Sequence, residues 1–168
     1  MKKFSRTLLI VALFSIPFIA HAASLGFPVV NDWSLEATSA MEAQKPIMVV
    51  FSSDSCQYCD NLTEQVLRPL INNGNLNHRV HLREYKTNRG GKVRDFDGEP
   101  IRSRIFVTRY QIFATPTVLF LAPNGEIIGK PIVGFNSAES YRPLLDEAIS
   151  KAAAYHSYRS PAIVTRVQ

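Results

Sequence analysis

The feature that most constrains this fold is an apolar strand followed almost at once by both cysteines of the chain. Residues 47–51 form a continuous apolar run rich in β-branched side chains, which predicts a central strand buried on both faces. A polar turn then leads to Cys56-Gln57-Tyr58-Cys59. The next apolar residues recur at helical spacing, so we expect a helix that begins at or just after Cys56. Pro69 is expected to end or kink it near Arg68.

A helix is expected before this strand, and a second strand after the cysteine helix. Asp32 can cap a helix over residues 33–43, which Lys45-Pro46 ends. Residues 80–85 alternate apolar and polar side chains, which predicts a strand with one buried face and with His81 facing solvent. The apolar positions of the first helix are Trp33, Leu35, Ala37 and Met41.

The second half of the chain predicts two further strands and a closing helix. Residues 117–121 form a strong strand, and residues 123–126 carry a hairpin-turn signal. Residues 127–135 should return as an antiparallel edge strand, weakened by a glycine and a proline. Asn136 with Glu139 resembles a capping box for the last helix, and Pro143 requires either a first turn near residues 140–142 or a kink. The apolar face of that helix is expected to be Leu144, Leu145, Ala148, Ile149 and Ala152.

This order of elements predicts an α/β fold. A βαβ half followed by a ββα half implies a central mixed four-stranded sheet with helices on both faces. The length of 168 residues suits one domain whose core needs no disulfide or metal for stability. Residues 88–104, between the second and third strands, have no clear period and are expected to be an irregular loop, with a short helix after it.

The first residues have the pattern of a secretory signal peptide. Lys2, Lys3 and Arg6 precede an apolar run over residues 7–20, and small residues surround a cut site near Ala22-Ala23. The run is shorter than the ~20 residues that span a bilayer as a helix. An uncleaved membrane anchor is the alternative. We therefore expect a leader over residues 1–22, a domain over 23–156 and a tail over 157–168.

Cleavage would change what the charge of the chain implies. It lowers the formal net charge from +5 to +2, because three cations and no acid are lost. No later stretch combines dense Lys and Arg with aromatic residues, so nucleic-acid binding is not expected. The mature protein, with no membrane span left, is expected in an oxidising compartment outside the cytoplasm, the periplasm.

Several hypotheses explain the two cysteines. A purely structural disulfide is poorly placed, because closing a four-residue ring contributes only ~2 kcal/mol, against about 3 kcal/mol for fifteen residues. A copper(I) or zinc chaperone could combine Cys56 and Cys59 with His78 and His81. A non-catalytic interaction module is a further alternative. The last hypothesis is redox catalysis, which requires neither a cofactor nor a metal.

Redox catalysis explains the spacing of the pair. Two intervening residues put both sulfurs on one turn of helix, close enough to form a disulfide without moving the backbone. Cys56 would face the unpaired N–H groups and the positive end of the helix dipole, which favour the thiolate. Cys59, on the apolar face, should be shielded and stay protonated longer. An exposed attacking thiolate and a buried resolving thiol are what thiol–disulfide exchange requires.

Over roughly residues 45–149 the sequence resembles the thioredoxin superfamily. The landmarks are residues 51–59, Ala114-Thr115-Pro116-Thr117, Asn124-Gly125-Glu126 and Gly134. The resemblance is strongest to the exported branch that includes SoxW-type proteins and the catalytic domains of DsbC-type isomerases. It implies that Pro116 is a cis-proline facing the cysteines, and that Thr115 and Pro116 orient a substrate strand. An ordinary trans strand start is the alternative.

The resemblance also implies the activity and its partners. Cys56 would attack a protein or peptide disulfide, Cys59 would resolve the mixed disulfide, and Tyr58 would pack or hydrogen-bond beside the pair. A reductase outside the cytoplasm needs an electron source, and the resemblance implies a membrane donor of the DsbD type.

The chain departs from the superfamily in ways that bear on the direction of electron flow. Val50 stands where thioredoxin has a buried acid, and Ser55 where a tryptophan is usual. No histidine or lysine separates the cysteines, and Asp54 and Asp60 oppose ionisation of a nearby sulfur. We therefore expect a pKa of Cys56 nearer the ~7 of thioredoxin than the ~3.5 of DsbA, and a reducing or isomerising pair.

The expected loop over residues 88–104 is also a candidate for substrate specificity. Its five cations would suit an acidic partner, although the loop's own acids would balance them if it were merely solvated. These cations are Arg89, Lys92, Arg94, Arg102 and Arg104.

Overall fold

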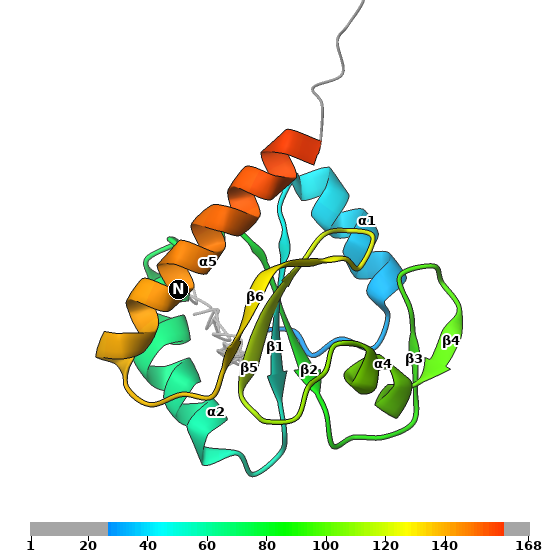
Figure 1. Cartoon of the computed structure of the whole chain (residues 1–168), viewed down its shortest axis with the longest axis horizontal. Helices are drawn as coiled ribbons and strands as arrows, with labels where there is room; N and C mark the ends of the chain where they lie inside the picture. The colour runs from blue at the N-terminus through cyan, green and yellow to red at the C-terminus, as the bar shows by residue number, and fades with distance from the viewer. Residues whose placement is uncertain (1–26, 160–168) are drawn as a thin grey trace, which may run out of the picture.

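The computed structural model describes residues 27–159 and shows a four-stranded sheet between two layers of helices (Figure 1). The predicted leader lies outside the described residues. The strands stand in the order β2-β1-β5-β6, with β2 parallel to β1 and the other neighbours antiparallel, which confirms the predicted mixed sheet. Their bounds are β1 Ile47–Ser52, β2 His81–Lys86, β5 Thr117–Leu121 and β6 Ile127–Val133.

Helices cover both faces of the sheet. The cysteine helix α2 (Gln57–Leu62), continued by the π-helical turn η1 (Thr63–Leu67) and by α3 (Arg68–Asn72), shares one face with α5 (Ala138–Arg159). The other face carries α1 (Trp33–Ala43) and α4 (Ser103–Arg109). No helix among residues 27–159 is long and apolar enough to cross a bilayer.

Strand β1 is buried on both faces, as its composition predicts. All six of its residues are buried. Met48 and Val50 pack under α2 and α5, whereas Val49 and Phe51 pack under α1 and α4. Because a strand held on both sides has a fixed position, the residue that follows it is also placed firmly, and this is where the cysteine turn begins.

An aromatic cluster organises the face that carries α1 and α4. Trp33 is fully buried and stacks on Phe106, with ring centroids 5.1 Å apart, and on Phe96 at 5.6 Å. Phe96 also supports the β5–β6 turn, because a Cβ on Gly125 would lie only 2.7 Å from its ring. The residue at this turn therefore has to be glycine, which also suits its φ of 83°.

The expected irregular loop over residues 88–104 is a wrong prediction. It contains an antiparallel hairpin, β3 (Lys92–Arg94) and β4 (Pro100–Arg102), and α4 begins at Ser103. Each strand has only three residues, too few for the alternation to be recognised in the sequence. Insertion of Val93 and Phe96 into the aromatic cluster holds the hairpin in place.

The helix that carries the cysteines continues past Arg68 to Asn72, so Pro69 does not end it. The π-helical turn η1 directly precedes α3, so the hydrogen-bond pattern of the helix changes just before Pro69. Proline has no N–H to donate to the carbonyl four residues earlier, that of Gln65. The guanidinium of Arg142 on α5 donates to that carbonyl instead, at 2.7 Å. A contact distant in sequence therefore satisfies the group that the proline leaves free.

In the first half of the chain, the buried faces of α1 and β2 differ from those that the sequence predicts. Leu35 and Met41 are 64% and 50% exposed, because α1 buries the face of Trp33, Ala37 and Ala40 instead. In β2, Leu82 and Tyr85 contribute to opposite core clusters, so both faces are partly buried.

Helix α5 differs from the expectation at its start, at its end and at one residue of its apolar face. The cap is Ser137, whose hydroxyl accepts from the N–H of Ser140, and not Asn136. The helix begins at Ala138 and contains Pro143 in its interior, so of the two alternatives a first turn near residues 140–142 is wrong. It extends to Arg159, three residues into the expected tail, while the rest of that tail lies outside the described residues. Leu144 is 52% exposed.

The contact between Arg142 and the Gln65 carbonyl can be tested with Pro69. We expect Arg142→Met to lower the free energy of unfolding by about 1 kcal/mol, the usual contribution of one hydrogen bond. In a Pro69→Ala background the restored N–H competes for the same carbonyl, so the cost of Arg142→Met should fall to less than half. Urea unfolding of the four proteins in a double-mutant cycle measures this coupling, and equal costs in both backgrounds would contradict it.

Candidate active site

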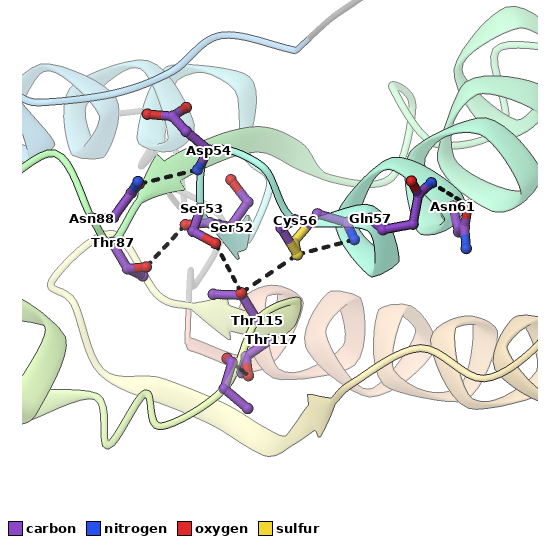
Figure 2. Close-up of a disulfide and its surroundings, with 12 residues drawn as sticks. Ser52, Ser53, Asp54, Cys56, Gln57, Asn61, Thr87, Asn88, Thr115 and Thr117 are labelled. Atoms are coloured by element: carbon purple, nitrogen blue, oxygen red, sulfur yellow. Dashed lines mark hydrogen bonds between the residues drawn. A yellow bond between two sulfur atoms is a disulfide. The ribbon is translucent and has the colours of Figure 1, made fainter.

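The site forms where β1 meets α2 and where the chain enters β5. Cys56 and Cys59 form a disulfide, with Cα atoms 5.2 Å apart. The peptide bond between Thr115 and Pro116 is cis, and Figure 2 shows the Thr115 hydroxyl beside the Cys56 sulfur. Residues almost sixty positions apart thus meet around one sulfur atom.

Cys56 caps its helix with a sulfur atom. The helix begins at Gln57, as predicted, and Cys56 has the extended backbone of a cap residue. Its Sγ accepts a hydrogen bond from the backbone N–H of Cys59 at 3.2 Å. The N–H groups at a helix start stabilise negative charge, so this position favours a Cys56 thiolate once the disulfide is reduced.

The two cysteines differ in exposure. Cys59 is only 6% exposed and belongs to the buried surface of α2, whereas Cys56 is half-buried. A substrate can therefore reach the first sulfur more easily than the second. This is the asymmetry that the spacing predicts.

A short hydrogen-bond relay ends on the Cys56 sulfur. Thr115 Oγ1 donates to Cys56 Sγ at 3.5 Å. Since the single hydroxyl proton of Thr115 is used there, the Ser53 hydroxyl donates to Thr115 Oγ1, at 3.2 Å. Donors in series polarise one another, which strengthens the bond to a thiolate. No pattern in the sequence predicts that Ser53, in a turn of four polar residues, donates to Thr115.

The position of Pro116 is fixed from the other side by β6. Its carbonyl accepts from the N–H of Gly134 at 2.7 Å. Thr117, the first residue of β5, also holds the turn, because its hydroxyl donates to the carbonyl of Ala114 at 2.8 Å. The Thr115–Pro116 corner is therefore tied on both sides while Thr115 faces the sulfur.

Cations engage Asp54, the acid nearest to Cys56 in the sequence. Arg89 lies 3.1 Å from the Asp54 carboxylate and Lys86 lies 3.8 Å from it. The hydrogen bond from Arg89 is the main reason why the pKa of Asp54 is lowered from its ordinary value. We expected this carboxylate to oppose a thiolate at Cys56. The neighbouring cations reduce that opposition.

A second cluster of polar side chains lies where the end of β1 meets β2: Ser52, Glu84 and Lys86. Ser52 is buried and donates to Glu84 Oε1 at 2.5 Å, and Lys86 lies 2.9 Å from the same oxygen. Val50, two residues earlier on the same strand face, is 2% exposed and packs in the apolar core. Glu84 was not singled out in the sequence, because an acid in an alternating strand usually faces solvent.

Two aromatic side chains that are close in sequence to the site residues face outward. Tyr58, between the cysteines, is 62% exposed and does not pack in the interior. Phe113, two residues before Thr115, is 88% exposed and was missed in the sequence. The signal that could have been used is an aromatic residue two positions before the Thr115-Pro116 turn, and its exposure matters because large apolar groups in water are usually covered by a partner.

The metal-binding hypothesis needs four residues that the fold keeps apart. His81 pairs with Ile47 at the start of β1, about 16 Å along the sheet from the end of that strand at Ser52, and Cys56 follows beyond that end. His81 is not solvent-facing as expected. Its ring bonds Glu36 Oε2 at 2.7 Å, and burial lowers its pKa from the ordinary value. His78 lies against Gly74, in the turn that precedes β2.

Comparison with known proteins places the chain in one family. A family model described as "Thioredoxin-like domain" matches residues 34–149. Curated protein sequences yield no match. Among solved structures, the oxidised C-terminal domain of Neisseria meningitidis DsbD is similar with 16% identity and a TM-score of 0.49, over 68% of this chain and 90% of that one. Fasciola hepatica thioredoxin is similar with 17% identity and a TM-score of 0.48, over 75% and 99%.

The relay predicts that the Thr115 hydroxyl lowers the pKa of Cys56. A hydrogen bond to a charged group contributes ~1.5 kcal/mol, so Thr115→Val should raise that pKa by about one unit in the reduced protein. Thr115→Ser, which keeps the hydroxyl, is the matched control, and Ser53→Ala should give a smaller rise. Thiolate absorbance at 240 nm against pH measures all three. An unchanged pKa in folded Thr115→Val would show that the bond does not act on the thiolate.

Proposed function

The chain belongs to the thioredoxin-like domain family and is a thiol–disulfide oxidoreductase, and from this premise we propose that it is an exported reductase or isomerase of protein disulfides. The observation that carries the proposal is the asymmetric pair itself. A half-buried sulfur that caps a helix is joined to a buried one. The family assignment rests on the model match over residues 34–149.

The reaction begins with the pair reduced. The Cys56 thiolate attacks one sulfur of a substrate disulfide, which forms a mixed disulfide and expels the other substrate sulfur as a thiolate that takes up a proton. Cys59 then loses its proton and attacks Cys56 Sγ. The Cys56–Cys59 disulfide forms, the second substrate sulfur leaves, and two electrons have passed to the substrate. In isomerisation, the expelled substrate thiolate instead attacks another disulfide of the same protein, and the thiolate displaced there attacks the mixed disulfide and releases Cys56 as a thiolate.

Three features support attack by Cys56 in preference to Cys59. The Cys59 N–H and the Thr115 hydroxyl both donate to Cys56 Sγ, and both bonds strengthen when the sulfur is charged. Cys56 is the more accessible of the two sulfurs. The cations at Asp54 reduce the local negative charge.

We propose that Thr115, Pro116 and Tyr58 orient the substrate. Thr115 stands at the Cys56 sulfur, directly before the strand that starts at Thr117, so an extended substrate segment can add alongside it. Tyr58, between the two cysteines, offers an exposed ring.

The sequence supports a place of action, and its resemblance to the exported branch supports an electron donor. The basic and apolar leader over residues 1–22 supports export to the periplasm, where disulfides persist. A reductase there must recover its dithiol, and we propose a membrane-bound dithiol donor of the DsbD type. The absence of a cation between the cysteines supports reduction or isomerisation over strong oxidation, in keeping with the SoxW-type and DsbC-type resemblance.

Replacement of each cysteine tests the order of attack. Cys56→Ser should abolish reduction of insulin disulfides, because the attacking thiolate is lost. Cys59→Ser should instead accumulate covalent mixed disulfides with substrate proteins, visible on non-reducing gels and cleared by dithiothreitol. Full activity of Cys56→Ser, or trapping by Cys56→Ser in place of Cys59→Ser, would refute the assignment.

Phe113 should contribute to the binding of protein substrates. Its side chain is 88% exposed, so Phe113→Ser should leave the melting temperature unchanged. Partial burial of the ring against a substrate contributes ~1 kcal/mol, which corresponds to about a fivefold rise in KM for insulin. Ile127→Ser, at a 45% exposed position on β6, is the matched control. Equal effects of the two substitutions would count against a role for Phe113.

A further inference from the structure

Three cations at the base of the β3–β4 hairpin have no acidic partner within residues 27–159. Lys92 and Arg102 are directly opposite each other in the strand register, and both are exposed. Arg104 follows in the first turn of α4 and is exposed as well. We call these three residues the basic edge. Other cations nearby are paired within the chain: Arg89 with Asp54, Arg94 with Asp32 and Arg109 with Asp95.

This arrangement does not serve the stability of the hairpin. Like charges directly opposite each other on antiparallel strands repel, which destabilises the pair. The hairpin is held by other groups, namely Val93 in the aromatic cluster and the buried Asp95, whose carboxylate lies 2.6 Å from Arg109. An uncompensated repulsion beside a well-anchored hairpin points to a role in binding an anion.

An apolar residue and a hollow adjoin the basic edge. Ile105 is 47% exposed and follows Arg104 on α4. A shallow hollow of about 430 Å³ is lined by Arg104, Ile105, Thr108 and Arg109. A polypeptide can satisfy both kinds of contact, because its carboxylates can reach the cations while an apolar side chain covers Ile105.

The basic edge is connected to the cysteine turn by a short series of contacts. The N–H of Ser103 donates to the carbonyl of Gly91 at 2.9 Å, which fixes the start of α4 beside the segment that precedes β3. Two residues before Gly91, Arg89 binds Asp54, which lies two residues before Cys56. Figure 1 shows α4 and the β3–β4 hairpin side by side. A partner at Cys56 can therefore extend towards the basic edge.

We propose that the basic edge docks an acidic segment of the substrate protein, next to the disulfide presented to Cys56. The inference rests on the proposed oxidoreductase function and names the class of substrate that it prefers. It also narrows the expectation for residues 88–104, since two of the five cations named there, Arg89 and Arg94, are already engaged within the chain.

The test uses the full, pre-reduced protein and three synthetic peptides that share one intramolecular disulfide loop. The loop is flanked by Asp and Glu, by Ser and Gly, or by Lys and Arg. Second-order rate constants for peptide reduction are measured at low and high salt, from samples quenched with an alkylating agent at successive times. We expect the acidic peptide to react roughly tenfold faster than the basic one at low ionic strength, and the ratio to shrink as salt screens the charges.

Lys92→Glu is the critical variant, and Lys130→Glu, at an exposed position of β6, changes the net charge equally. Lys92→Glu should lower the acidic-to-basic ratio to about a third or less, whereas Lys130→Glu should leave it near the original value. Because Lys92→Glu sets opposite charges across the hairpin, its melting temperature should stay equal or rise, so that a lower ratio cannot result from unfolding.

The outcomes separate this inference from the proposed function. Equal rates for the three peptides in the original protein, or equal effects of the two variants, would overturn the docking of an acidic segment. Failure to reduce any of the peptides would overturn the oxidoreductase activity on peptide disulfides instead.

Discussion

The chemistry of this protein depends on a sulfur atom that takes the place of an oxygen at the start of a helix. The cap position normally holds a side chain that accepts one of the free backbone N–H groups. Here Cys56 accepts from the N–H of Cys59, the residue with which it forms the disulfide. One backbone geometry therefore lowers the cost of a thiolate at the first sulfur and holds the second within reach. The fully buried strand β1 fixes the position of this junction.

Two kinds of polar group lie around the Cys56 sulfur: hydroxyl donors in a hydrogen-bonded chain that ends on it, and charged side chains further away. Thr115 and Ser53 supply a chain of hydroxyl donors, while Arg89 and Lys86 engage Asp54, the acid nearest in sequence. Direct donors stabilise the thiolate more than distant charges, which solvent and salt screen at such an exposed site. These contacts favour a thiolate at Cys56, as the reducing or isomerising pair that we propose requires.

Sequence reasoning succeeded where local pattern and tertiary structure agree. The apolar run of β1, the helix start at Cys56 and the antiparallel return of β6 are each encoded within about ten residues. Sequence reasoning failed where a residue distant in the sequence determines the local structure. Pro69 remains in a helix because Arg142 satisfies the carbonyl of Gln65. The β3–β4 hairpin has strands too short to show a period, and the relay through Ser53 depends on a residue far along the chain.

The most direct test of the central claim is the relative reactivity of the two sulfurs. The reduced, folded protein is treated with limiting iodoacetamide at pH 7, and modification of Cys56 and Cys59 is followed by mass spectrometry. Cys56 is half-buried at a helix start and Cys59 is 6% exposed, so Cys56 should be labelled at least about tenfold faster. Equal labelling of the two cysteines, or faster labelling of Cys59, would contradict the assignment of Cys56 as the attacking thiolate.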